Sequence, residues 1–316
     1  MVLNLLFLTP LAAALLSLIV PVRKVVVSAN LVGATGLLVF GVSTALKVFS
    51  QGQQMAWGGL LYLDALNAYL LVAISTVGFL GCIYSVGYMG HELEEGVITE
   101  KKYGRYFFWL YLFIFTMLLV VSANNLGLMW VAIEGTTLAT ALLVGFYREK
   151  ASLEAAWKYI IICSVGITFA LFGTILVYFT GTRAMGGVAY ALNWSELIKV
   201  AGQLDPKLLK LAFIFILVGY GTKAGLVPMH TWLPDAHSQA PSPVSALLSG
   251  VLLNCALYGI VRYHIILKSS PAVGEGYSSG LLIIFGILSL GFVVPFILIQ
   301  HDLKRLLAYS SVEHMG

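Results

Sequence analysis

The chain has 316 residues, of which 59% are hydrophobic and 10% are charged, and its mean hydropathy is +0.93. Soluble domains carry about 25% charged residues, because charges are needed to cover a surface that faces water. The composition therefore excludes a water-soluble protein and predicts an integral membrane protein with many spans. The net charge of +4 selects no class of partner, since the position of each basic residue relative to the membrane matters more than the sum.

Nine apolar runs are long enough to cross a bilayer as a helix, which takes about 20 residues. They occupy residues 2–20, 25–46, 65–87, 106–122, 125–146, 155–180, 208–229, 243–266 and 279–299. A tenth helix is predicted to begin near Asp302 and to be still running at Gly316. The predicted fold class is an all-α polytopic membrane protein, with the polar stretches 88–105 and 181–207 as loops.

The first run is followed by Arg23 and Lys24 and preceded by no basic residue, unlike a cleaved signal sequence. It is therefore predicted to be a retained helix with the N-terminus outside the cell. This orientation places nine basic residues on the cytoplasmic side: Arg23, Lys24, Lys101, Lys102, Arg105, Arg148, Lys150, Lys304 and Arg305. It places seven on the outer side: Lys47, Arg183, Lys199, Lys207, Lys210, Arg262 and Lys268. The excess follows the positive-inside rule, and the predicted location is the cytoplasmic (inner) membrane.

The three cysteines, Cys82, Cys163 and Cys255, stand singly inside apolar runs. They form no CxxC pair for a metal, an iron–sulfur cluster or a disulfide framework. The sequence also lacks paired mid-helix histidines that could hold a haem. No cofactor is therefore expected in this chain, and redox centres are expected on partner chains.

Glu134 lies about nine residues into the fifth apolar run, which at ~1.5 Å per residue is mid-bilayer. An ionisable group at that depth costs at least a few kcal/mol unless it faces protein or water. Glu134 is therefore a candidate functional carboxylate. The alternative is a protonated, hydrogen-bonded side chain that only holds helices together.

Lys223 lies in the seventh run and is followed closely by Gly225 and Pro228, with Gly221 just before it. Proline removes a helix hydrogen bond and glycine relaxes the backbone, so the helix is predicted to be interrupted between about 221 and 228. Broken helices at membrane depth occur where they line a cavity or are buried in protein. Lys223 and Glu134 are therefore predicted to form a switchable pair, with a lysine that snorkels to the interface as the alternative.

His230, Asp235 and His237 follow the interruption. Their spacing matches no zinc pattern, so metal binding is disfavoured. Neutral imidazoles near a broken helix suit proton delivery to Lys223, although capping of the loop is an equal alternative for His237.

Lys158 lies near the start of the sixth run, with Glu154 four residues before it. On spacing alone, an ion pair at the membrane interface is the simplest interpretation.

Four segments together resemble one known family. They are the run 223–254 with its stretch HTWLPDAHSQAPSPVSALLSG, the segment Met129–Gly135 around Glu134, the pair Trp157–Lys158, and the end 302–316. They resemble the antiporter-like subunits of respiratory complex I, of multisubunit cation/proton antiporters and of energy-converting hydrogenases. The resemblance implies about fourteen helices in two inverted five-helix repeats, each with a broken helix, and a hydrophilic axis that passes protons or sodium ions.

Under this resemblance the chain divides into three parts. Residues 1–105 form three helices and a cytoplasmic loop, 106–266 a complete first repeat with its half-channel, and 267–316 the truncated start of a second repeat.

The resemblance also assigns roles to single residues. Glu134 matches the glutamate of the fifth helix and Lys223 the lysine of the broken seventh helix. Lys158 matches a lysine of the sixth helix, so the resemblance favours a functional role for it over a plain ion pair at the surface. Lys304 would continue the hydrophilic axis. Asn254 stands where many complex I subunits have a lysine, which favours the hydrogenase-4 and formate hydrogenlyase branch, and component F in particular.

The predicted function is translocation of protons, or exchange of sodium for protons, by a membrane-arm subunit of a multisubunit redox complex. A group 4 membrane-bound hydrogenase is favoured, with iron–sulfur and NiFe centres on other membrane and peripheral subunits; no nucleic-acid partner is expected. Three alternatives stay open: a non-conducting truncated scaffold, a subunit of complex I, and a subunit of a cation/proton antiporter.

Overall fold

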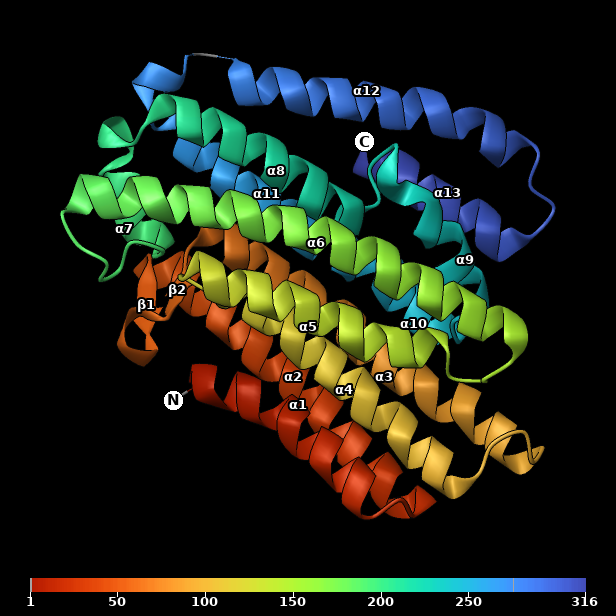
Figure 1. Cartoon of the computed structure of the whole chain (residues 1–316). Coiled ribbons are helices and arrows are strands. Elements are labelled where there is room, and N and C mark those ends of the chain that lie inside the picture. Colours follow the sequence, from red (N-terminus) through yellow and green to blue (C-terminus); the bar gives the residue numbers. More distant parts are fainter. Residues whose placement is uncertain (1, 275) are drawn as a thin grey trace.

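The computed structural model describes residues 2–274 and 276–316 and is built almost entirely of helices (Figure 1). The long helices are α1 (Val2–Ile19), α2 (Arg23–Gln51), α3 (Ala65–Glu94), α4 (Glu100–Ser122), α5 (Leu126–Val144), α6 (Lys150–Met185), α8 (Pro206–Ala224), α11 (Leu253–Lys268) and α12 (Tyr277–Leu298). The shorter ones are α7 (Trp194–Lys199), α9 (Trp232–Gln239), α10 (Ser242–Leu247), α13 (Leu303–Met315), the 3₁₀ turns η1 (Trp57–Gly59), η2 (Ala201–Gln203), η3 (Met229–Thr231) and η5 (Pro271–Val273), and the π-helical segment η4 (Leu248–Leu252). Strands β1 (Gln54–Ala56) and β2 (Leu61–Leu63) pair antiparallel in a small hairpin that the sequence pattern did not indicate.

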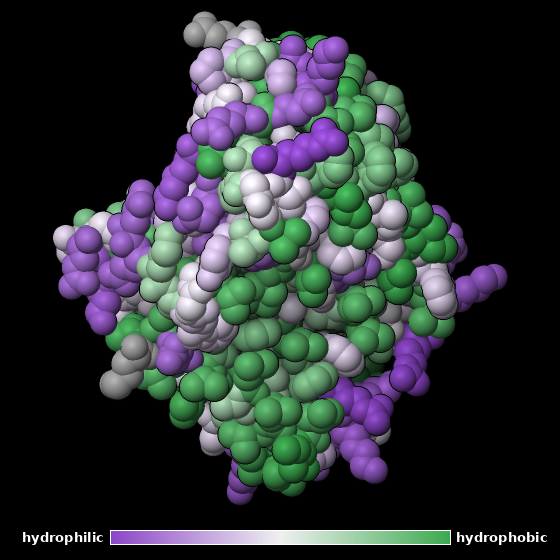
Figure 2. All heavy atoms as spheres, turned by 60° about the vertical axis from the view of Figure 1, so that its left-hand side comes forward, coloured by the Kyte–Doolittle hydropathy of each residue, from purple (hydrophilic) through white to green (hydrophobic). Residues whose placement is uncertain are grey.

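The described residues contain nine segments long and apolar enough to cross a membrane, in the order of the nine predicted runs. One of them joins α8, η3 and α9 (Pro206–Gln239), and another joins α10, η4 and α11 (Ser242–Lys268). Hydrophobic side chains cover wide continuous areas of the face in Figure 2, as contact with lipid requires. The protein is therefore a multi-pass membrane protein, and the predicted fold class is confirmed.

The ends of the helices differ from the prediction. α3 runs to Glu94 and α4 begins at Glu100, so the predicted loop 88–105 is reduced to residues 95–99. α6 extends to Met185, and α7 lies inside the predicted loop 181–207. An apolar run marks the stretch inside hydrocarbon, whereas a helix continues into water for as long as its polar residues favour it, so hydropathy predicts these helices too short.

The helices pack side by side across the molecule, with α1 at one edge and α12 at the opposite edge (Figure 1). α1 lies against α2 and α4, α4 against α5, α5 against α6, α6 against α8, and α8 against α11. α13 packs between α12 and α9. Most of the α12 surface is exposed.

Small residues bring α6 and α8 very close together. A Cβ atom added to Gly219 would lie 2.5 Å from the backbone nitrogen of Ala170, and one added to Gly166 would lie 2.6 Å from Cβ of Thr222. Small side chains at such a crossing let two membrane helices approach at backbone distance. This contact positions the end of α8, which carries Lys223, against α6.

Candidate functional site

The helix that carries Lys223 is interrupted inside the predicted range. α8 ends at Ala224, and Gly225 takes φ = 78°, a left-handed conformation that favours glycine. The amide of Gly225 donates to the carbonyl of Thr222, and the amide of Leu226 donates to the carbonyl of Gly221 at 2.8 Å. Helical structure resumes at η3.

Polar side chains bind backbone groups at the interruption. The indole nitrogen of Trp232 donates to the carbonyl oxygen of Thr222 at 2.8 Å. The amide of Val227 donates to the hydroxyl of Ser289 on α12 at 3.0 Å. The break is therefore buried in protein and held from both sides, as broken helices at membrane depth require.

Lys223 is completely buried, with 0% of its surface exposed. Its Nζ donates to Oγ1 of Thr137 on α5 at 3.0 Å and to the hydroxyl of Tyr159 on α6. The same Nζ lies 4.5 Å from the ring centre of Tyr159 and 5.9 Å from that of Trp232. The side chain points into the helix bundle, which argues against snorkelling to the interface.

Glu134 is half-buried on α5 and lies one helical turn before Thr137. The hydroxyl of Ser164 on α6 donates to its Oε1 at 2.8 Å, while its Oε2 is buried and has no hydrogen-bond partner in the described structure. No ion pair joins Glu134 and Lys223 within the described ranges. Lys223 thus binds α5 at Thr137, one turn from Glu134, without a direct contact to the Glu134 carboxylate.

The ring of His230 contacts other helices than Lys223 does. The ring of His230 packs against Phe292 of α12 (5.5 Å between ring centres) and Tyr309 of α13 (6.4 Å). His230 and His237 are both buried, and each has one ring nitrogen without a hydrogen-bond partner among the described residues. The interruption therefore turns His230 towards α12 and α13, whereas Lys223 faces α5 and α6.

A charged cluster lines a cavity of about 390 Å³ between α6, α9 and the start of α13. Nζ of Lys158 lies 2.9 Å from the carboxylate of Glu154, which confirms the predicted pair, and 3.2 Å from that of Asp235, which the sequence did not indicate. Asp235 also pairs with Arg305. Asp235, which lies between His230 and His237 in the sequence, is therefore paired with two cations.

Lys304 extends from α13 to the end of α9. Its Nζ donates to the carbonyl oxygen of Ala240 at 3.0 Å. Asp302 begins α13, as predicted, because its carboxylate accepts a hydrogen bond from the amide of Arg305 at 2.8 Å. Asn254, by contrast, donates to the carbonyl of Gly250, four residues earlier in the same membrane-spanning segment, at 2.9 Å.

A second buried cation is Arg262, which the sequence indicated only as one of the basic residues outside the bilayer core. It lies inside α11, is 3% exposed, and makes two hydrogen bonds of 2.7 and 2.8 Å to the carboxylate of Asp64. Its guanidinium lies 4.3 Å from the ring centre of Trp194 and donates to the hydroxyl of Tyr258 at 2.8 Å. Asp64 directly precedes α3, 198 residues away, and no local pattern connects the two.

Family comparisons cover most of the chain. A family described as "NADH:quinone oxidoreductase/Mrp antiporter, TM" matches residues 123–316, and one described as "NADH-Ubiquinone oxidoreductase (complex I), chain 5 N-terminus" matches residues 56–107.

Individual relatives are similar over most of this chain. A hydrogenase-4 component F homolog of Methylacidiphilum infernorum is 44% identical over 259 residues, which are 82% of this chain and 54% of the relative. NADH-quinone oxidoreductase subunit N of Hydrogenovibrio crunogenus is 30% identical over 284 residues, 89% of this chain and 55% of that one. The chain thus spans about half the length of the curated relatives it matches.

Two solved structures share the fold. A chain of the membrane-bound sulfane sulfur reductase, an archaeal respiratory membrane complex, superimposes with a TM-score of 0.82 at 23% identity, over 99% of this chain and 63% of that one. A chain of respiratory complex I from Thermus thermophilus superimposes with a TM-score of 0.74 at 25% identity, over 100% of this chain and 62% of that one.

Proposed function

Because the chain belongs to the NADH:quinone oxidoreductase/Mrp antiporter family of membrane subunits, we propose that it translocates protons as a membrane-arm subunit of a multisubunit redox complex. The observation that carries the proposal is Lys223, an amine buried at a helix break whose hydrogen-bond partners among the described residues are hydroxyl groups. A cation buried in membrane-spanning helices is costly unless a partner neutralises it, so its presence there points to a function.

Glu134 acts on this lysine through space. Its carboxylate lies one turn from Thr137, which binds Lys223, and has one oxygen free of hydrogen bonds in the described structure. A negative charge at that point stabilises the ammonium form of Lys223, and neutralising it releases that stabilisation. The pair thus alternates between loading and releasing a proton.

The charged cluster at Lys158 supports a route for protons to reach this pair. Lys158, Asp235 and Arg305 line a cavity at the end of the bundle where α9 begins, and His237 and Lys304 lie on the elements that border it. In this proposal protons pass from the cavity by His237 and His230 towards Lys223, and Lys304 continues the axis. The free ring nitrogens of the histidines can accept and donate protons.

The chemistry of the Lys223 site favours protons over sodium ions. Sodium is held by several oxygen ligands, and a neighbouring ammonium would repel it. The groups at Nζ of Lys223 are two hydroxyls and two aromatic rings.

The wider setting belongs to the same proposal. We place the chain in the cytoplasmic membrane with its N-terminus outside, in a complex of the membrane-bound hydrogenase type, with the iron–sulfur and NiFe centres on partner subunits. The 44% identity to a hydrogenase-4 component F homolog supports this branch. The boundaries at 105 and 266 and the inverted repeats stay predictions.

The test is Glu134→Gln in the assembled complex, with proton uptake into proteoliposomes measured during turnover. Glutamine keeps the shape and a hydrogen bond from Ser164 but removes the charge, so assembly is expected to persist while most proton uptake is lost. Glu134→Asp is expected to retain part of it. Glu149→Gln, an exposed carboxylate outside every ion pair of the described structure, is the matched control.

Normal proton uptake in the Glu134→Gln complex would contradict the role of this carboxylate. Unchanged uptake in variants of both Glu134 and Lys223 would favour a scaffold that conducts nothing.

A further inference from the structure

A cavity of about 380 Å³ opens between the start of α4, the end of α5 and the start of α6, away from the Lys223 site. Its volume lies within the range of about 300–1,000 Å³ that is usual for ligand sites. Three basic residues line it, Lys102 and Arg105 from α4 and Arg148 from the turn between α5 and α6, and no acidic residue does. The cavity therefore carries a concentrated positive charge.

These three cations have no internal ion-pair partner among the described residues. Within the described ranges, no carboxylate lies within ion-pairing distance of Lys102, Arg105 or Arg148. Arg148 has φ = 60°, a left-handed conformation that a non-glycine residue rarely adopts, and its amide donates to the carbonyl of Gly145 at 3.1 Å. The tight turn holds Arg148 at the cavity although the backbone conformation is unfavourable, which is typical of a position kept for binding.

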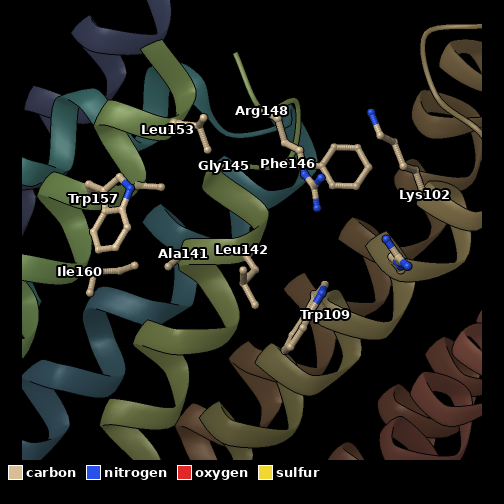
Figure 3. A pocket seen from close by; sticks show the side chains of 12 residues that line it. Lys102, Trp109, Ala141, Leu142, Gly145, Phe146, Arg148, Leu153, Trp157 and Ile160 are labelled. Carbon is tan, nitrogen blue, oxygen red and sulfur yellow. The ribbon is translucent and has the colours of Figure 1, made fainter. Parts of the chain in front are cut away.

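The cavity changes character with depth along the helices. α4 begins at Glu100, so Lys102 and Arg105 lie in its first two turns, and Trp109 lies one turn further towards the middle of the span on the same face. In Figure 3, Lys102 and Arg148 lie at the upper end of the view and Trp109, Leu142 and Ile160 lie below them. The polar end is thus at the end of the span, and the apolar wall runs towards its middle.

The apolar wall is open to the surroundings of the protein. Trp157 is 63% exposed and Leu142 is 49% exposed, and both line the cavity. Tryptophan is enriched where membrane proteins meet the boundary between headgroups and hydrocarbon.

We propose that this cavity binds one anionic phospholipid, with its phosphate between Lys102, Arg105 and Arg148 and an acyl chain along Trp109, Leu142 and Trp157. A phosphodiester supplies the negative charge that three unpaired cations lack, and arginine binds phosphate through two parallel hydrogen bonds. Free phosphate would leave the exposed apolar wall uncovered, whereas a phospholipid satisfies both ends. The proposal does not depend on ion transport by the chain.

The test is native mass spectrometry of the delipidated complex, titrated with phosphatidylglycerol or phosphatidylcholine of identical acyl chains. The double variant Lys102→Gln/Arg148→Gln is expected to lose one tightly bound phosphatidylglycerol, with an affinity for that lipid lower by roughly 30-fold, since each basic residue near a membrane surface contributes about fivefold. Phosphatidylcholine has the same phosphate, but its choline cation cancels the net charge, so its binding is expected to stay as in the wild type. Lys101→Gln, an exposed neighbour outside the cavity, is the control and should leave both lipids unchanged.

Three results would overturn the proposal: equal loss of both lipids in the double variant, unchanged binding of phosphatidylglycerol, or displacement of the lipid by millimolar inorganic phosphate. The melting temperature of the lipid-free double variant should equal that of the wild type, because the substituted side chains make no ion pair in the described structure. A lower value together with unchanged lipid binding would likewise count against the site.

Discussion

Lys223 and Arg262 are both cations buried in membrane-spanning helices, but they have different kinds of partner. Arg262 makes two short hydrogen bonds to the carboxylate of Asp64, at 2.7 and 2.8 Å. Lys223 has two hydroxyl groups and two aromatic rings around Nζ, and no carboxylate of the described residues forms an ion pair with it.

The difference separates a structural charge from an exchangeable one. A guanidinium does not release its proton in proteins, and a carboxylate in direct contact fixes its charge further. An amine whose hydrogen-bond partners are hydroxyls has no carboxylate in direct contact. Its protonation therefore depends on charged groups beyond those hydroxyls. The Arg262 centre therefore holds β2, α3, α7 and α11 together, whereas in the proposed function the Lys223 centre changes its charge.

The largest effect on stability is expected at the Arg262 centre. Asp64→Asn keeps an N-cap for α3, since asparagine caps helices as well as aspartate does, but leaves the guanidinium unpaired. Breaking a buried pair by removing one charge costs about 3–5 kcal/mol of unfolding free energy. The loss should appear as a lower melting temperature and reduced assembly of the complex.

Lys223→Met is the matched comparison for that measurement. The substitution removes a buried cation that has no ion-pair partner among the described residues. The hydroxyl of Tyr159 keeps its hydrogen bond with Thr140 (2.6 Å). The melting temperature should therefore stay equal to that of the wild type or rise. Equal destabilisation by both variants would remove the distinction between the two centres.

A smaller effect is expected at His230, which lies off the Lys223 face. His230→Ala should slow proton uptake by less than about tenfold, the size of one lost hydrogen-bonding group, and leave the metal content of the complex unchanged. Stopped-flow measurement of uptake with metal analysis of the same sample checks this. Loss of a stoichiometric metal would show instead that His230 is a ligand.

The sequence predicted the features that depend on local pattern. Apolar runs located the nine spans, and glycines with a proline around Lys223 located the break, because hydrocarbon thickness and missing helix hydrogen bonds leave direct traces in the order of residues. The pair of Lys158 and Glu154 was predicted for the same reason, since residues four apart on a helix face each other.

The features that depend on packing between helices were not predicted. Tyr159 and Thr137 meet Lys223 only because glycines on α6 and α8 let these helices approach closely, and no periodicity says which neighbour a face will meet. The buried pair of Arg262 and Asp64 was missed for a related reason, because the two residues are 198 positions apart in the sequence.

The central claim is that Lys223 must release its proton and does not merely provide a positive charge. Lys223→Arg tests it, because arginine keeps the charge but does not give up its proton. Proton uptake per turnover of the redox partner is measured in proteoliposomes, with Lys207→Arg, an exposed lysine on the same helix, as the control. Both variants are expected to assemble into the complex. The Lys207→Arg complex should take up protons normally, and the Lys223→Arg complex should lose most proton uptake. Normal uptake in the Lys223→Arg complex would contradict the claim.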